Sequence, residues 1–213
     1  MKKLLSYIYP ITTAITSEHN GTLEITWHDG KKYLNTKNTN YSYGSLQTIL
    51  KFGLEQIDFH KVHSILLLGL GGGCVIETLR EDFNYKKAIT AVDIDPKIIE
   101  IAAHEFNIQN NEQLKIVCAD AFQFMKENTQ PFDLIIIDLF VDVNVPEQFL
   151  EIPFWEYVMK ALSSHGTILF NAALEKPNSN TFQDIVGFLI RNAFHVNAFE
   201  KVNKTNSLVL AKR

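Results

Sequence analysis

The 213-residue sequence has few cysteines, no strong excess of charge and no long hydrophobic run. Two cysteines, Cys74 and Cys118, are too few for a disulfide-rich secreted scaffold, and neither they nor the seven histidines show metal-site spacing. A formal net charge of −4 predicts neither a nucleic-acid nor a membrane partner. No apolar run approaches the roughly 20 residues that a membrane-spanning helix needs. These features predict a cytoplasmic protein without a metal ion.

A glycine-rich turn between two predicted strands is the most informative stretch of the sequence. The strand 64–69 leads into the turn, and the strand 88–93 ends on Asp93. The turn contains Gly69, Gly71 and Gly73. Glycines let a ligand approach the backbone, and the start of the following helix, 73–82, offers unpaired N–H groups. A carboxylate after the second strand can accept hydrogen bonds from ribose hydroxyls, so the unit predicts a nucleoside-binding site.

The glycine pattern excludes two common nucleotide-binding motifs. No Gly-Lys-Ser/Thr follows, as a P-loop requires, and Cys74 occupies the sixth position, where the dinucleotide fingerprint has Gly or Ala. Gly69-x-Gly71-x-Gly73 instead resembles the first motif of S-adenosylmethionine-dependent methyltransferases. The expected cofactor is S-adenosyl-L-methionine or its decarboxylated form.

Predicted strands and helices alternate from residue 64 onward. The strands are 64–69, 88–93, 114–118, 133–138, 166–171, 193–199 and 206–211, and the helices are 73–82, 96–106, 120–128, 151–162 and 178–191. This alternation predicts a mostly parallel sheet with helices on both faces. The connection between the last two strands is too short for a helix, so they should pair antiparallel. The predicted α/β fold resembles the Rossmann-like, seven-stranded methyltransferase sheet.

The first 42 residues differ in character and predict a small N-terminal β element, followed by a helix at about 45–57. The predicted hairpin strands are 22–27 and 31–35, joined by a turn at Asp29-Gly30. We therefore divide the chain into this element, 1–42, and an S-adenosylmethionine-binding Rossmann-like domain, 43–213. A two-stranded hairpin alone is marginal in water, so the element should pack on the main domain or on a second subunit in a homodimer.

Four aspartates follow predicted strands and should meet at the carboxyl edge of the sheet, where open α/β folds bind ligands. They are Asp93, Asp95, Asp120 and Asp138. Asp95 precedes Pro96 and is most simply a helix N-cap. Asp120 could cap the next helix or accept a hydrogen bond from the adenine amino group, and the sequence leaves both open. Asp93 has no helix to cap directly, which favours contact with ribose.

Asp138 ends an apolar strand and precedes a long loop, residues 139–150, which predicts a lid or binding element. A carboxylate there can orient or deprotonate a nucleophile beside the cofactor sulfonium. The alternative is that Asp138 only fixes the loop by hydrogen bonds. Asp142, within the loop, is a second candidate catalytic acid. Asn171, at the end of the fifth strand, either contributes to this edge or satisfies backbone groups.

Residues from about 20 to 175 resemble the spermidine synthase family, the aminopropyltransferase branch of this fold. The matching motifs are GLGGGCV, VDIDP, CADAF and IIIDLF. In that family the acid matching Asp93 holds the ribose, the one matching Asp120 contacts adenine, and the one matching Asp138 serves the catalytic site. The expected cofactor-binding residues are Gly69, Gly71, Gly73, Asp93, Ile94, Asp120, Ala121 and Asp138.

Three departures from the spermidine synthase pattern concern the amine-binding side of the site. The family's Tyr-His-Glu reads Tyr43-Gly44-Ser45 here, Gly72 stands where the family has an aspartate, and Asp138 and Asp142 are four residues apart rather than three. A dicationic diamine needs compensating carboxylates. We therefore predict a methyltransferase of spermidine synthase-like type that uses S-adenosylmethionine and acts on an unidentified small acceptor. The alternatives are aminopropyl transfer from the decarboxylated cofactor to a polyamine, and a non-catalytic nucleoside-binding domain.

Overall fold

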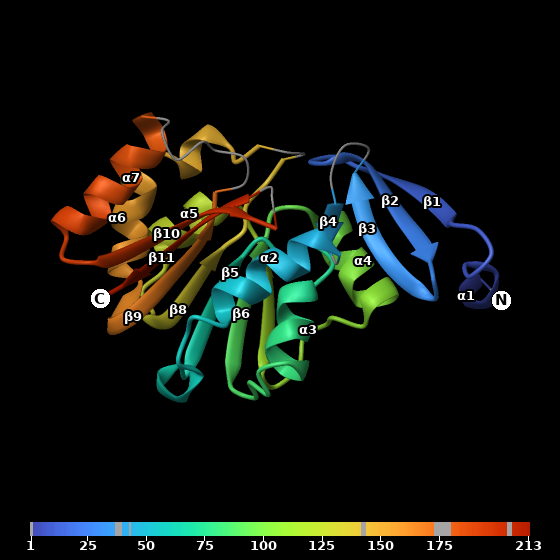
Figure 1. Cartoon of the computed structure of the whole chain (residues 1–213), viewed down its shortest axis with the longest axis horizontal. Helices are drawn as coiled ribbons and strands as arrows, with labels where there is room; N and C mark the ends of the chain where they lie inside the picture. The colour runs from blue at the N-terminus through green and yellow to red at the C-terminus, as the bar shows by residue number, and fades with distance from the viewer. Residues whose placement is uncertain (1, 37–39, 43, 142–143, 173–179, 204–205) are drawn as a thin grey trace.

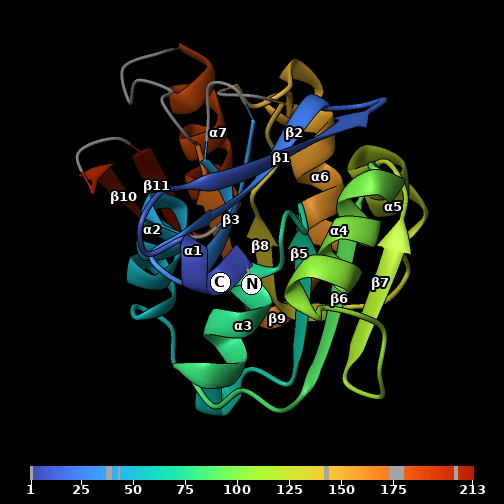
Figure 2. The same cartoon turned by 90° about the vertical axis from the view of Figure 1, so that its right-hand side faces the viewer.

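Two β-sheets, one of seven strands and one of four, organise the chain in the computed structural model (Figure 1). The structure describes residues 2–36, 40–42, 44–141, 144–172, 180–203 and 206–213. In Figure 2, which faces the four-stranded sheet, its strands run across the molecule in front of the seven-stranded sheet. No helix within the described ranges has the length and apolar composition needed to cross a membrane.

The seven-stranded sheet has the order β10-β11-β9-β8-β5-β6-β7. Its strands are β5 (Ser64–Leu68), β6 (Ala88–Asp93), β7 (Leu114–Cys118), β8 (Phe132–Ile137), β9 (Leu162–Asn171), β10 (His195–Val202) and β11 (Asn206–Lys212). The first five pair in parallel, and β11 pairs antiparallel with both β9 and β10. The predicted α/β fold and its antiparallel final pair are confirmed.

Helices cover both faces of this sheet (Figure 1). They are α2 (Ser45–Leu54), α3 (Cys74–Glu81) and α4 (Pro96–Phe106) on one face, and α5 (Ala121–Glu127), α6 (Ile152–Lys160) and α7 (Asn180–Arg191) on the other. Successive side chains of a strand point to opposite faces, so Leu66 and Leu68 pack against α5 to α7 whereas Ile65 and Leu67 pack toward α2 and α3. The apolar run of β5 is therefore buried throughout, as its sequence predicts.

The N-terminal sheet is larger than the predicted hairpin. It has the order β1-β2-β3-β4 and consists of β1 (Ile11–Ser17), β2 (Gly21–His28), β3 (Lys31–Thr36) and β4 (Asn40–Ser42), preceded by the short helix α1 (Lys2–Leu5). The hairpin forms the central pair, and its turn residues Asp29 and Gly30 both have positive φ, 48° and 73°. The division at residues 42 and 43 stays a prediction.

Apolar side chains attach the N-terminal sheet to the outer side of α4. Leu23, Ile25 and Leu34 of the sheet form one buried cluster with Ile98 and Ile101. This contact explains why the hairpin is stable, since α4 supplies the apolar surface that two strands alone lack.

Asp95 connects the two sheets by hydrogen bonds. Its Oδ1 accepts from the backbone N–H of Lys97 at 2.8 Å, which caps α4 as the sequence indicates. Its Oδ2 accepts from the Ser17 hydroxyl and, at 2.6 Å, from Asn20 Nδ2. Because Asp95 is 1% exposed, these donors have no ready replacement in water. The same carboxylate therefore starts α4 and holds the end of β1.

Replacing Asp95 with alanine is expected to lower the free energy of unfolding by about 2–4 kcal/mol, because the cap is lost and buried donors are left unpaired. Urea unfolding monitored by circular dichroism measures the change. Asp184→Ala, at an exposed position of α7, is the control and should change stability by less than about 0.5 kcal/mol. An equal stability for the two variants would contradict the anchoring role of Asp95.

Candidate functional site

The glycine turn that follows β5 lies directly against the start of the loop that follows β8. Gly69 has φ 95°, and a Cβ there would lie 2.1 Å from the backbone carbonyl oxygen of Asp138. Gly73 has φ 85°, and a Cβ there would lie 2.5 Å from the Ile108 side chain. Neither contact leaves space for a side chain, so glycine is required at both positions.

Asp93 organises this turn through its side chain. Its Oδ2 accepts from the backbone N–H groups of Leu70 at 2.9 Å and Gly71 at 3.3 Å, and its Oδ1 accepts from Asp95 N at 3.0 Å. Burial raises the pKa of Asp93 to about 6, although these three hydrogen bonds act to lower it. A carboxylate has about four acceptor positions, so the predicted ribose contact remains compatible with this arrangement and stays a prediction.

Asp120 begins the helix α5. Its Oδ1 accepts from Gln123 N at 2.9 Å, so the capping alternative is confirmed. Its Oδ2 accepts from Gln148 Nε2 at 3.2 Å, which connects it to η2 (Glu147–Phe149) in the loop after β8. The predicted contact with adenine is untested by these bonds. Of the two remaining candidates, Ala121 is buried, whereas Ile94 is 42% exposed beside Asp93.

Asp138 follows β8 and is connected to the neighbouring strands. Its backbone N–H donates to Leu68 O at 2.8 Å, and its Oδ1 accepts from Asn171 Nδ2 at 2.9 Å. Asn171 in turn accepts from Asn206 Nδ2 at 3.0 Å. Burial raises the pKa of Asp138 to about 7, opposed by the hydrogen bond from Asn171. The carboxyl group is therefore placed to gain or lose a proton near neutral pH, as an acid–base residue must.

The loop after Asp138 is anchored to the core at its far end. Val145 and Phe149 are buried, and the Phe149 carbonyl accepts from Trp155 Nε1 at 3.1 Å. The candidate Asp142 lies outside the described residues, as does Tyr43. Closure of this loop over a ligand stays a prediction.

Backbone hydrogen bonds bring the predicted residues to one edge. Gly69 N donates to Val92 O at 2.9 Å, and Ala119 N donates to Asp93 O at 3.0 Å. Together with the bond from Asp138 N, they join the carboxyl ends of β5, β6, β7 and β8. The glycine turn, Asp93, Asp120 and Asp138 therefore share the edge where parallel sheets bind ligands.

Two residues of this edge were not predicted, Asn206 and Gln148. Asn206 lies at the end of a polar segment whose sequence is typical of a turn, and Gln148 lies within the predicted loop 139–150, so neither has a local signal of a site residue. Their contacts with Asn171 and Asp120 span 35 and 28 residues of sequence. Only the pairing of β9 with β11 and the folding of the loop could have indicated them.

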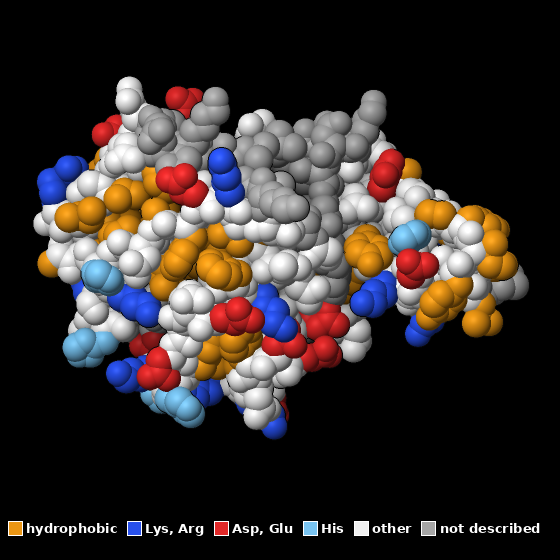
Figure 3. Space-filling view, in the orientation of Figure 1, with side chains coloured by type: hydrophobic (Ala, Val, Ile, Leu, Met, Phe, Trp, Pro, Cys, Tyr) orange, Lys and Arg blue, Asp and Glu red, His pale blue; other side chains and the backbone are white. Residues whose placement is uncertain are grey.

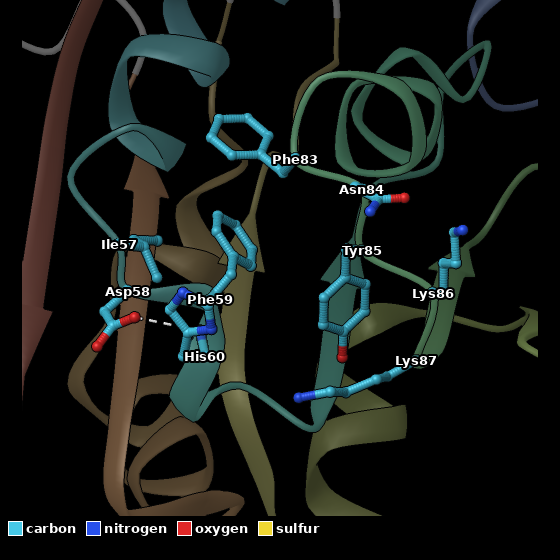
Figure 4. Close-up of a pocket in the computed structure, with 9 residues that line it drawn as sticks. All are labelled: Ile57, Asp58, Phe59, His60, Phe83, Asn84, Tyr85, Lys86 and Lys87. Atoms are coloured by element: carbon cyan, nitrogen blue, oxygen red, sulfur yellow. Dashed lines mark hydrogen bonds between the residues drawn. The ribbon is translucent and has the colours of Figure 1, made fainter.

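A hollow of about 480 Å³ lies at the opposite, amino edge of the sheet (Figure 4). It is formed by residues 57–60 before β5 and residues 83–87 before β6, with the rings of Phe59 and Phe83 4.9 Å apart. Asp58 accepts from His60 N, and Lys87 Nζ donates to Val62 O at 2.8 Å. These polar groups serve the local structure, and the hollow is separated from Asp138 by the length of β5, roughly 16 Å.

Comparison with known proteins identifies relatives of the chain. The family described as the Spermine/spermidine synthase domain matches residues 46–202. A polyamine aminopropyltransferase from Vibrio vulnificus is 29% identical over 134 residues, which cover 60% of this chain and 44% of that protein. One from Sulfurisphaera tokodaii is 32% identical over 120 residues, which cover 53% and 39%. The chain spans less than half the length of these relatives.

Solved structures share the fold. A probable spermidine synthase from Corynebacterium glutamicum has a TM-score of 0.68 and 17% identity, over 96% of this chain and 77% of that chain. Human methyltransferase-like protein 13 has a TM-score of 0.60 and 21% identity, over 78% and 79%. At such identities these similarities establish the architecture alone.

The family and the relatives correct the predicted reaction. Methyl transfer was expected because Gly44, Ser45 and Gly72 stand where the spermidine synthase pattern has other residues. That expectation is wrong, since the matching domain is a spermine/spermidine synthase domain and the relatives are named aminopropyltransferases. A pocket that binds a dicationic diamine can draw its carboxylates from other positions, so the replacement of two acids and one histidine does not exclude a diamine.

Proposed function

Because the chain belongs to the family of spermine/spermidine synthase domains, we propose that it transfers an aminopropyl group from decarboxylated S-adenosylmethionine to a polyamine. The observation that carries the proposal is Asp138, a partly buried carboxyl group with a pKa of about 7 beside the glycine turn. A group with this pKa can take a proton from an attacking amine at neutral pH. The names of the relatives support the same reaction.

In this proposal the donor substrate lies at the carboxyl edge of the sheet. Gly69, Gly71 and Gly73 allow its adenosine and sulfonium end to approach the backbone. Asp93 accepts hydrogen bonds from the ribose, and Asp120 accepts one from the adenine amino group. Ile94 and Ala121 border these two acids and supply apolar contact to the nucleoside.

Asp138 would act on the acceptor amine. The lone pair of the neutral amine nitrogen attacks the aminopropyl carbon bonded to sulfur. The new C–N bond forms as the C–S bond breaks, and its electron pair stays on sulfur to give methylthioadenosine. The nitrogen then carries an excess proton, which passes to Asp138. Because the sulfonium is already a good leaving group, the remaining contribution of the protein is to position the two substrates. Asp142 is the proposed second acid for the cationic acceptor.

Diamine-dependent release of methylthioadenosine tests the proposal. Supplied with decarboxylated S-adenosylmethionine and putrescine or spermidine, the protein should release methylthioadenosine at a rate that depends on the amine concentration. S-adenosylmethionine with the same amines is the control and should give no turnover. Binding of methylthioadenosine by calorimetry without any turnover would overturn the transferase proposal in favour of the non-catalytic nucleoside-binding alternative.

We also propose that the N-terminal segment is the contact surface of a homodimer. Leu4, Tyr7, Ile8 and Tyr9 are between 54% and 79% exposed, and Figure 3 shows hydrophobic side chains gathered at this end of the molecule. The segment is nevertheless held in place, because Ser6 accepts hydrogen bonds from Asp29 N and Gly30 N at 3.1 and 3.0 Å. The adjacent strand β1 is an edge strand that a second copy could pair with.

Sedimentation equilibrium tests this surface. The wild-type protein is expected to be a dimer, and Ile8→Lys should be monomeric because a charge would have to be buried in the interface. Ile190→Lys is the matched control, since Ile190 is also an exposed isoleucine but lies on α7. A monomeric wild-type protein, or a dimer that persists in Ile8→Lys, would refute the assignment.

A further inference from the structure

Three strands contribute one polar side chain each to a connected chain of hydrogen bonds. Asp138 follows β8, Asn171 ends β9, and Asn206 begins β11. Because β11 runs antiparallel to β9, its first residue lies at the same edge as the last residues of the parallel strands. Asn206 Nδ2 donates to Asn171 Oδ1 at 3.0 Å, and Asn171 Nδ2 donates to Asp138 Oδ1 at 2.9 Å.

The orientation of the Asn171 amide decides which of its atoms faces Asp138. An amide has a donor and an acceptor end, and a rotation of 180° exchanges them. Asn206 presents a donor, so it favours the orientation with Asn171 Oδ1 toward Asn206 and Nδ2 toward Asp138. The opposite orientation would place two acceptors together at Asp138 and two donors together at Asn206. Because Asn171 is 0% exposed, water cannot readily relieve that conflict.

We propose that Asn171 and Asn206 are positioning residues for Asp138: Asn206 fixes the Asn171 amide, and its Nδ2 then holds the Asp138 carboxylate as a hydrogen-bond acceptor. The role of Asp138 as the proton acceptor rests on the proposed function. The hydrogen bonds themselves do not, since they join this protein's own side chains.

The hydrogen bond from Asn171 is the main interaction that lowers the pKa of Asp138 against the effect of burial. The glycine turn from β5, residues 69–73, and the described ends of β9 and β11 carry no titratable side chain at this edge. Asp93, at the end of β6, is the nearest acid in sheet order, two strands away. Of the other charged residues nearby in sequence, Glu147 lies in η2 and Glu200 and Lys201 lie in β10, beyond β11 from Asp138. Four more lie outside the described residues: Asp142, Glu175, Lys176 and Lys204. A hydrogen bond to the charged form of an acid lowers its pKa, whereas burial raises it.

Three leucine variants separate the positioning role from a general effect on the fold. Asn171→Leu removes the donor and keeps the branching of the side chain at Cγ, and Asn206→Leu removes the group that orients it. Asn197→Leu is the matched control, because Asn197 lies at an exposed position of β10 and takes no part in the hydrogen bonds between Asn206, Asn171 and Asp138. The pKa of Asp138 is measured in each ligand-free protein by carbon-detected nuclear magnetic resonance titration of its carboxyl group.

Asn171→Leu is expected to raise the pKa of Asp138 by about 1 or more, since a hydrogen bond to a charged group is lost. Asn206→Leu should raise it by a smaller amount, because the Asn171 amide can then rotate, and Asn197→Leu should leave it unchanged. An unchanged pKa in both Asn171→Leu and Asn206→Leu would overturn the inference. If Asn171→Leu does not fold, the partly exposed Asn206 position still provides the test.

A second measurement connects the pair to turnover. A higher pKa of Asp138 keeps it protonated to higher pH, so the acid limb of kcat against pH should move upward in Asn171→Leu by the same amount. The KM for the donor should not change. If the wild-type protein shows no turnover, the proposed function fails while the titration still decides the positioning role. A shifted titration with an unshifted kcat profile would overturn the role of the pair in proton transfer.

Discussion

Replacing Asp138 with asparagine is expected to reduce diamine-dependent release of methylthioadenosine by about 10²–10⁴-fold, the usual contribution of a positioned acid–base group. Asparagine has nearly the same shape, and its Oδ1 can still accept from Asn171 Nδ2. The amide cannot take a proton at neutral pH, so only the proton transfer is removed. The measurement is kcat at pH 8 with both substrates at saturation.

Two controls keep this result specific. Asp184→Asn makes the same chemical change at an exposed position of α7 and should leave kcat unchanged. The affinity of Asp138→Asn for methylthioadenosine should stay within about twofold of wild type, since this product is neutral and makes no ion pair with the carboxylate that is removed. In the wild-type protein kcat should fall as pH decreases through about 7, because Asp138 becomes protonated there. An undiminished kcat in Asp138→Asn would exclude Asp138 as the proton acceptor.

The central strands could be predicted because each is a run of consecutive apolar residues, which indicates burial on both faces. Residues 65–68 and 134–137 are continuous apolar runs, and every one of these side chains is 0% exposed. The edges of the N-terminal sheet could not be predicted in this way. β1 has the sequence ITTAITS, which shows no regular alternation of apolar and polar residues and buries only Ser17 fully, so no apolar pattern marks it as part of a sheet. Its pairing depends on β2 and on the contact with Asp95.

In the candidate site, too, local patterns identified some residues, whereas residues that act through long-range contacts were missed. Asp93 and Asp138 could be found because each directly follows an apolar strand, and parallel strands end at one edge. The distant partners of Asp95 and of Asn171, which contacts Asp138, could not be found. Ser17 meets Asp95 across 78 residues, and Asn206 meets Asn171 across 35. Such contacts depend on strand order and register, which local patterns do not contain.

Ionisation of Asp138 lowers the free energy of unfolding, and replacement with asparagine should remove this effect. The folded-state pKa of Asp138 is about 7, above the usual 3.8, because burial disfavours the charged form. The folded state therefore binds this proton more tightly than the unfolded state, and the group lowers stability as pH rises from about 4 to about 7. We expect Asp138→Asn to be more stable than wild type by about 2–4 kcal/mol at pH 8, and by only about 1 kcal/mol at pH 4.5. Urea unfolding at the two pH values measures both differences.

Asp93 provides the contrast that tests the cause. Burial also raises its pKa, to about 6, but its two oxygens accept three backbone N–H groups of the glycine turn and of Asp95. In Asp93→Asn one of these acceptors becomes a donor, so a donor would face a donor in a buried turn. Removing the buried charge at Asp93 should therefore give no stabilisation at pH 8, whereas the same change at Asp138 should stabilise the protein. Two results would contradict this effect of the Asp138 carboxyl group. One is that Asp138→Asn is no more stable than wild type at pH 8, and the other is that its additional stability does not decrease toward pH 4.5.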